Sequence, residues 1–296
     1  MALYGLSEAD LREYCRRVME SLELWLRRLI DDVLTPTYGA DYLNAQDDHG
    51  NYIINREVRE NVAQRKRQEP QRYARLIDAA LLDDEIKILC HQQLYGYFRA
   101  ALEGAFPDGT TEARTFLTRL VEPRNRLSHA NPISVRQAER VICYSNDVID
   151  SLKEYYGAVG RAAEYNVPSV IRAVDSFGNV ALPNQQHNPE IFDYRKNQAH
   201  ELRPGQTISV EVEIDPAFSP GQYAIVWEWD SARLMDCNKV TILIERSHVS
   251  ELFTIECKVV SNEDWHKYRY YDHRVVFMYR VLPPLEGAAP TRSTRS

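Results

Sequence analysis

The sequence of 296 residues has few cysteines and no long apolar run. Its five cysteines are widely spaced, without a CxxC pair, which is typical of a reducing compartment rather than a disulfide framework. No apolar run approaches the roughly 20 residues that span a bilayer. The N-terminus also becomes charged too soon for a secretory signal. We therefore expect a cytoplasmic protein with no membrane partner.

A basic excess is also absent. The formal net charge is −7, and both halves of the chain are mildly acidic, which disfavours a general polyanion-binding protein. Any contact with nucleic acid must then be a local site. The chain has no P-loop, GxSxG or dinucleotide fingerprint, so we expect no cofactor. His266, Asp272 and His273 lack a metal-ligand spacing, so we expect no metal either.

Up to residue 163 the apolar residues recur with a helical period, which predicts an all-α helical bundle over residues 1–163. Ser7 and Asp10 form a capping box for a first helix, which Thr35-Pro36 should end. Further helices are expected over residues 55–68, 70–82, 83–102 and 111–121, and from the Ser134–Gln137 cap to residue 159.

After residue 163 the pattern changes to short β-branched and aromatic runs separated by glycine- and proline-containing turns. Clear strands are expected over residues 207–215, 223–229, 239–245, 252–260 and 274–281, with weaker ones near 168–174 and 191–194. This predicts an antiparallel β-sandwich of immunoglobulin-like type over residues 164–284. Residues 285–296 should be a disordered tail.

One basic motif, EPRNRLSHANP at residues 122–132, lies between two predicted helices. Positions four apart on a helix differ by about 40° and positions five apart by about 140°, so Asn125 should share a face with His129. Arg124 must reach round with its long side chain, which leaves its guanidinium free for an anion. Alternatively, the motif is a helix C-terminus whose basic groups complement the helix dipole. Arg195 and His200 repeat the same bare spacing, so only context distinguishes the two matches.

With this motif leading into its final long helix, the helical half resembles the HEPN (higher eukaryotes and prokaryotes nucleotide-binding) superfamily. The resemblance covers about the first 160 residues. Many members are metal-independent endoribonucleases that carry R-x4-6-H with Asn after the Arg, act as dimers and serve toxin or antiviral systems. In toxins paired with nucleotidyltransferase antitoxins a Tyr often lies two positions after the His, and Asn131 in this chain argues against that subgroup.

The residue types fit such chemistry. Histidine can take the proton from a ribose 2′-OH or give one to the leaving 5′-oxygen, and arginine can stabilise the phosphorane. We expect Arg124 to hold the phosphate, His129 to transfer protons, Asn125 to position His129, and Arg126 to be an auxiliary RNA contact. One histidine per chain cannot do both jobs at once, so we expect a homodimer. The product would carry a 2′,3′-cyclic phosphate.

The β half contains no catalytic constellation but an aromatic stretch with Trp265, Tyr268, Tyr270 and Tyr271. Such residues anchor protein interfaces as readily as they stack bases. The acidic charge favours a protein partner, such as a regulator or antitoxin. The alternative for the whole chain is a non-catalytic adaptor whose helical half dimerises or binds a nucleotide or partner.

Overall fold

The computed structural model describes residues 3–70, 73, 75–183 and 189–285, and the chain divides into two units. The first unit runs to Val167 and also includes Asp215–Phe218, and the second begins at Pro168 and resumes at Ser219. The helical unit therefore extends beyond the predicted boundary at residue 163. Of the predicted tail, residues 286–296 lie outside the described residues.

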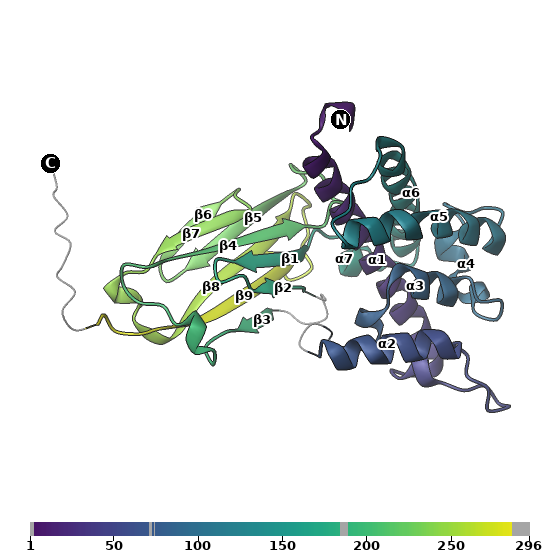
Figure 1. The fold of residues 1–296 in the computed structure, drawn as a ribbon, viewed down its shortest axis with the longest axis horizontal. Coiled ribbons are helices and arrows are strands. Elements are labelled where there is room, and N and C mark those ends of the chain that lie inside the picture. Colours follow the sequence, from purple (N-terminus) through teal and green to yellow (C-terminus); the bar gives the residue numbers. More distant parts are fainter. Residues whose placement is uncertain (1–2, 71–72, 74, 184–188, 286–296) are drawn as a thin grey trace. The chain divides into compact units, whose positions relative to one another are not determined.

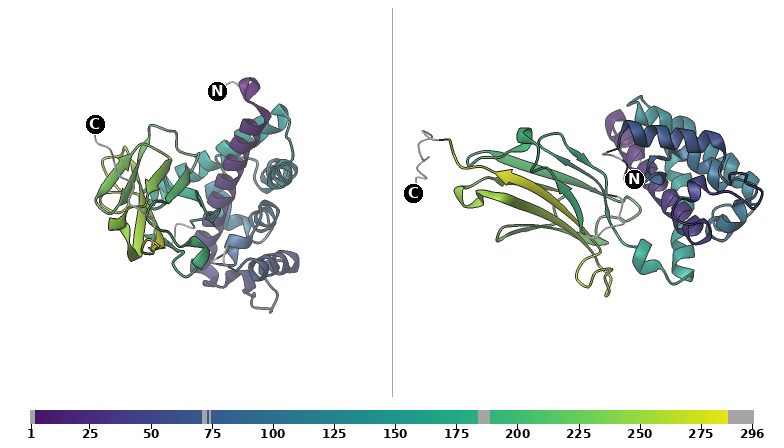
Figure 2. Two further views of the ribbon diagram at one scale, coloured as in Figure 1. Left: turned by 60° about the vertical axis from the view of Figure 1, so that its left-hand side comes forward. Right: turned by 90° about the horizontal axis from the view of Figure 1, so that it is seen from below.

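The first unit is built of helices (Figure 1). They are α1 (Glu8–Tyr38), α2 (Arg56–Gln68), α3 (Leu82–Leu89), α4 (Tyr95–Leu102), α5 (Thr110–Ser128), α6 (Val135–Ala158) and α7 (Ala162–Tyr165). Figure 2 shows the long α1, in purple, running along this unit, and it packs against α3, α4, α5 and α6. Its buried side chains, among them Leu22, Trp25 and Leu29, form the centre of the helical core.

Three of the expected helices differ from the structure. Pro36 does not end α1 but lies within its last turn, and Gly39 closes the helix at φ 82° with its N–H on the Thr35 carbonyl. The helix expected over residues 83–102 is broken between Leu89 and Tyr95, where Arg114 donates to the Cys90 carbonyl.

The helix expected over residues 70–82 is also wrong within the described residues, which contain only a 3₁₀ turn over Ile77–Ala79. The Asp78 carboxylate accepts the backbone N–H of Arg75 at 2.8 Å. A side chain that accepts the backbone N–H of the residue three positions before it marks the start of a helical turn, and here that turn does not continue beyond Ala79. Among the helices that the structure describes, none combines the length and apolar character needed to cross a bilayer.

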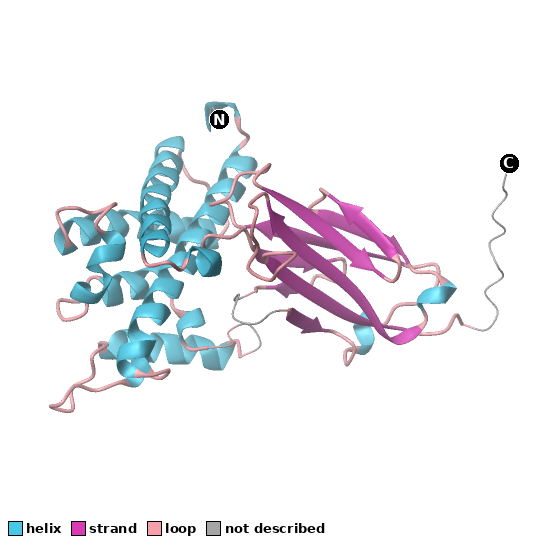
Figure 3. Cartoon of the chain, turned by 180° about the vertical axis from the view of Figure 1, so that it is seen from behind, coloured by secondary structure: helices cyan, strands magenta, loops and turns pink. Residues whose placement is uncertain are grey.

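The second unit contains two sheets (Figure 3). The first has the order β2-β1-β4-β7 and the second β3-β9-β8-β5-β6. The strands are β1 (Val170–Asp175), β2 (Val180–Ala181), β3 (Glu190–Asp193), β4 (Thr207–Ile214), β5 (Tyr223–Trp229), β6 (Ala232–Met235), β7 (Lys239–Leu243), β8 (Ser250–Ser261) and β9 (His273–Val281). All the expected strands are present, whereas β2 and β6 were not expected.

The two sheets share one hydrophobic core, in which Val210 and Ile242 of the first sheet lie with Trp227 and Cys257 of the second. The pairings are antiparallel, with the exception of β3, which runs parallel to β9. The chain therefore combines a helical part with a two-sheet part, as the periodicity of its sequence predicts.

Candidate active site at the end of α5

The basic motif forms the last turns of α5 and the turn that follows. Ala130 donates its N–H to the Leu127 carbonyl at 3.1 Å, and Asn131 donates to the Arg126 carbonyl at 2.9 Å. Ala130 itself has φ 54°. This pair of bonds closing on a left-handed residue is a Schellman motif, in which that residue is usually glycine. His129 is the C-cap, directly before the left-handed residue.

Asn125, Arg126 and His129 are exposed, whereas Leu127 is buried and continues the core stripe of α5. Within the part of the chain that the structure describes, the His129 imidazole makes no hydrogen bond. The expected contact from the Asn125 side chain to the imidazole is therefore not present. The bond between the two residues is the backbone one of the last helical turn, in which His129 donates its N–H to the Asn125 carbonyl at 3.2 Å.

Arg124 points into a contact with α1. Its Nε donates to Glu23 Oε1 at 2.6 Å, and the two side chains are 16% and 7% exposed. Its Nη nitrogens are neither buried nor partnered among the described residues. The sequence predicted a guanidinium free for an anion, and the structure holds that group by one edge while its other edge stays accessible.

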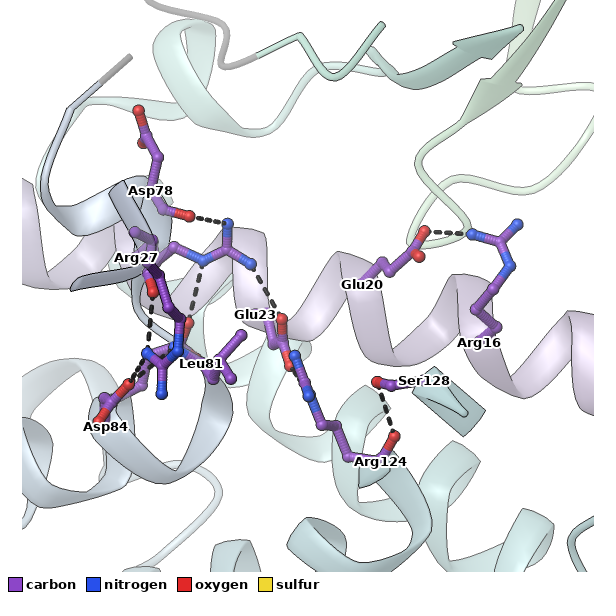
Figure 4. Close-up of polar contacts among 12 residues, drawn as sticks. Arg16, Glu20, Glu23, Arg27, Asp78, Leu81, Asp84, Arg124 and Ser128 are labelled. Atoms are coloured by element: carbon purple, nitrogen blue, oxygen red, sulfur yellow. Dashed lines mark hydrogen bonds and ion pairs between the residues drawn. The ribbon is translucent and has the colours of Figure 1, made fainter. Parts of the chain in front are cut away.

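Glu23 is itself part of a longer buried network (Figure 4). Its Oε2 accepts Arg27 Nη2 at 3.0 Å, and Arg27 Nε donates to Glu85 Oε1 at 3.0 Å. Glu85 is completely buried, and this burial raises its pKa although Arg27 opposes the shift. This series of ion pairs joins α5, α1 and α3 through Arg124, Glu23, Arg27 and Glu85. It therefore fixes where the Arg124 guanidinium lies.

Sequence reasoning missed Glu23, Arg27 and Glu85. Glu23 and Arg27 are four residues apart on α1, a spacing that usually marks an exposed helix pair. The available signal was their place beside Leu22, Trp25 and Leu26, although charged residues are frequent along the whole helix. Arg126, expected to be an RNA contact, uses Nε for the Pro132 carbonyl at 3.0 Å and Nη1 for Glu122 at 3.3 Å.

The second match to the motif has a different setting, in the unit of strands. Arg195 forms two hydrogen bonds with Asp193, at 2.9 and 2.7 Å. The His200 ring lies 3.5 Å from Asn179 Nδ2, and its centroid is 5.0 Å from that of Phe177. Both side chains are therefore engaged by neighbours, unlike His129.

The aromatic stretch lies in the loop between β8 and β9. Trp265 is 38% exposed and Tyr270 is 68% exposed. Tyr268 and Tyr271 are half-buried and pack on one another with ring centroids 5.6 Å apart. The buried Asp272 carboxylate accepts the backbone N–H groups of Ser261 and Lys267 and so orders the base of this loop. Two of the four aromatic residues are thus available to a partner.

The rest of the described chain offers few groups that could bind a metal or carry out chemistry. Across the described ranges, no group of three or more His, Cys, Asp and Glu side chains could hold a metal ion. A cavity of about 400 Å³ in the second unit is lined by charged residues, most of them already in ion pairs: Asp193, Arg195, Lys196, Glu251 and Arg280. No family model matches the chain, and no curated protein matches its sequence.

At the end of α5, in contrast, the structure provides an exposed imidazole and, five positions before it, a guanidinium whose Nη nitrogens make no hydrogen bond within the described residues. An imidazole can accept and donate a proton near neutral pH. A guanidinium fixed by one edge can bind a phosphate with the other.

Proposed function

We propose that the protein is a metal-independent endoribonuclease of the HEPN type, with Arg124 and His129 as its catalytic residues. The observation that carries this proposal is the state of Arg124. Its Nε is fixed by the buried Glu23, while its Nη nitrogens remain available at the same helix end as the exposed His129. A basic group that only complements the helix dipole needs no buried carboxylate to orient it.

In the proposed reaction, the imidazole of one His129 removes the proton from a ribose 2′-OH. The 2′-oxygen attacks the adjacent phosphorus, and the Arg124 Nη nitrogens stabilise the charge on the phosphorane oxygens. The bond to the 5′-oxygen breaks, and that oxygen takes a proton from a second, protonated imidazole. The products are a 2′,3′-cyclic phosphate and a free 5′-OH, and DNA cannot react because it lacks the 2′-OH.

The second imidazole comes from a second copy of the chain in this proposal, because each chain has one histidine in the motif. The helical unit then forms a homodimer that brings two α5 ends together. Light scattering on the purified protein should give a dimer. A fully active monomer at the working concentration would remove the two-histidine mechanism.

The immunoglobulin-like unit has a binding role in this proposal. By binding a partner it senses a signal, recruits a target or restrains the nuclease. The HEPN resemblance suggests a toxin or antiviral-defence setting, in which a protein regulator or antitoxin binds the exposed Trp265 and Tyr270. Pull-downs with the full chain and with the Trp265→Ala/Tyr270→Ala variant should differ in the partner recovered, while cleavage of free RNA stays equal.

A second candidate is a non-catalytic adaptor, and one specific observation favours it. Arg124 is engaged by a carboxylate of its own chain, as expected for a structural ion pair. An adaptor would keep this pair for packing and would cleave no RNA.

The two candidates are separated by incubating the full chain with total RNA, and with single-stranded DNA, in EDTA. The endoribonuclease should cut the RNA to fragments that end in 2′,3′-cyclic phosphate and leave the DNA intact. Arg124→Lys keeps the charge but loses the planar fork, so it should cleave at least tenfold more slowly. Intact RNA at micromolar protein would support the adaptor instead.

A further inference from the structure

The turn that carries His129 is held by side chains as well as by its backbone bonds. Arg126 Nε donates to the Pro132 carbonyl at 3.0 Å. From α1, Arg12 Nη1 donates to the Ala130 carbonyl at 2.9 Å, across a sequence separation of 118 residues. This second contact holds the backbone of the residue directly after His129. Helix α1 therefore contacts both parts of the motif, through Glu23 at Arg124 and through Arg12 next to His129.

Ala130, whose carbonyl Arg12 holds, has an unfavourable backbone conformation. Ala130 has φ 54°, where a residue with a Cβ is less stable than in the right-handed region. Such a conformation persists where the surroundings hold it, and it is a recurrent feature of functional sites. Because the His129 imidazole has no hydrogen bond of its own within the described residues, its direction depends on the backbone on either side of it.

We propose that Arg12 is a positioning residue for His129. By holding the Ala130 carbonyl, Arg12 fixes the left-handed turn and therefore the direction in which the imidazole leaves the end of α5. The catalytic consequence rests on the proposed ribonuclease function of His129, but the positioning of the ring does not.

The kinetic test uses Arg12→Ala in the full chain. We expect kcat to fall about tenfold with KM unchanged, since Arg124 still binds the phosphate. Arg12→Lys retains a donor and should keep most of the activity. Adding Ala130→Gly to Arg12→Ala should restore kcat, because glycine adopts the left-handed turn without support. Arg99→Ala is the control for loss of a charge, since Arg99 lies on α4 and is 67% exposed.

A rise in KM with kcat unchanged, and no rescue by Ala130→Gly, would show that Arg12 contacts the substrate, and the positioning role would be wrong.

A second readout needs no RNA. The ¹H–¹³C NMR signal of the His129 imidazole, assigned with His129→Gln, should shift or broaden in Arg12→Ala and return in the double variant. An unchanged signal in Arg12→Ala overturns the proposal even if the protein is an active nuclease. If the wild type cleaves no RNA, the NMR result still decides whether Arg12 positions the ring, so the two failures are distinguishable.

Discussion

Arg124 and His129 differ in how deeply each side chain is built into the helical unit. Arg124 is 16% exposed and bonded to Glu23, which is 7% exposed, whereas His129 is exposed and without a side-chain hydrogen bond in the described chain. A polar residue at an exposed helix end usually tolerates alanine without loss of folding. For Arg124 that expectation conflicts with its burial, because its removal leaves a buried carboxylate with one partner fewer.

We therefore predict that Arg124→Ala lowers the free energy of unfolding by about 2 kcal/mol, below the full cost of an unpaired buried charge because Arg27 still binds Glu23. His129→Ala should change it by less than about 0.5 kcal/mol. Urea unfolding measures both, with Arg99→Ala as the exposed control. Equal stability of Arg124→Ala and the wild type would mean that the bond to Glu23 is weak in solution.

The residues of the site were only partly predictable. A motif of arginine and histidine beside a proline is visible in the sequence, and so is the buried Leu127. Glu23 lies 101 residues before Arg124 along the chain. A contact over that distance depends on how the helices pack, which local periodicity does not determine.

At the scale of elements, periodicity predicted the long helices and the strands well. It failed at two places where a side chain bonds to the backbone. Arg114 donates to the Cys90 carbonyl where α3 gives way to α4, and the Asp78 carboxylate accepts the Arg75 N–H ahead of a 3₁₀ turn that does not extend. The cap of α6 was predicted correctly because Ser134 and Gln137 are local to one another.

The contact between α1 and α3 leads to a pH prediction. Burial raises the pKa of Glu85 in the folded state above the value of about 4.3 that it has when unfolded. The folded state therefore binds more protons than the unfolded state above that pH, so this residue's contribution to stability is complete below it. The contribution is lost as the pH rises through the folded-state pKa.

Glu85→Gln should remove this dependence. The free energy of unfolding of the variant, relative to the wild type, should increase as the pH is raised from about 4 toward neutrality. Urea unfolding at a series of pH values measures the difference, and Glu103→Gln, at the C-cap of α4, where the glutamate is 58% exposed, is the control. A difference that does not change with pH would show that Glu85 titrates at its ordinary pKa in the fold.

For the whole molecule, the two units are not simply consecutive along the chain. Asp215–Phe218, between β4 and β5, belongs to the helical unit. Asp215 is fully buried there, and its carboxylate accepts the Ser21 hydroxyl and the Trp25 indole N–H. A helical fragment that ends near residue 163, the boundary predicted from the sequence, lacks this segment. Its activity would therefore not report on the helical unit as it is in the full chain.

We predict that Asp215→Ala lowers the free energy of unfolding of the full chain by about 3 kcal/mol, because two buried donors lose their acceptor. Asp48→Ala, in an exposed loop of the same unit, should have little effect. Thermal or urea unfolding decides the matter, and an Asp215→Ala variant as stable as the Asp48→Ala control would contradict the buried contact. The sequence gives no sign of this segment's position, since residues 207–215 follow an ordinary strand pattern.

Proton transfer by His129 during RNA cleavage is tested by one paired comparison. Full-length wild type, His129→Ala and His200→Ala are incubated with total RNA in EDTA, and the initial rate of appearance of 2′,3′-cyclic phosphate ends is measured. We expect His129→Ala to lose at least a hundredfold in rate, and His200→Ala to cleave as the wild type does. Cleavage that survives in His129→Ala, or that is lost in His200→Ala alone, would contradict this role of His129.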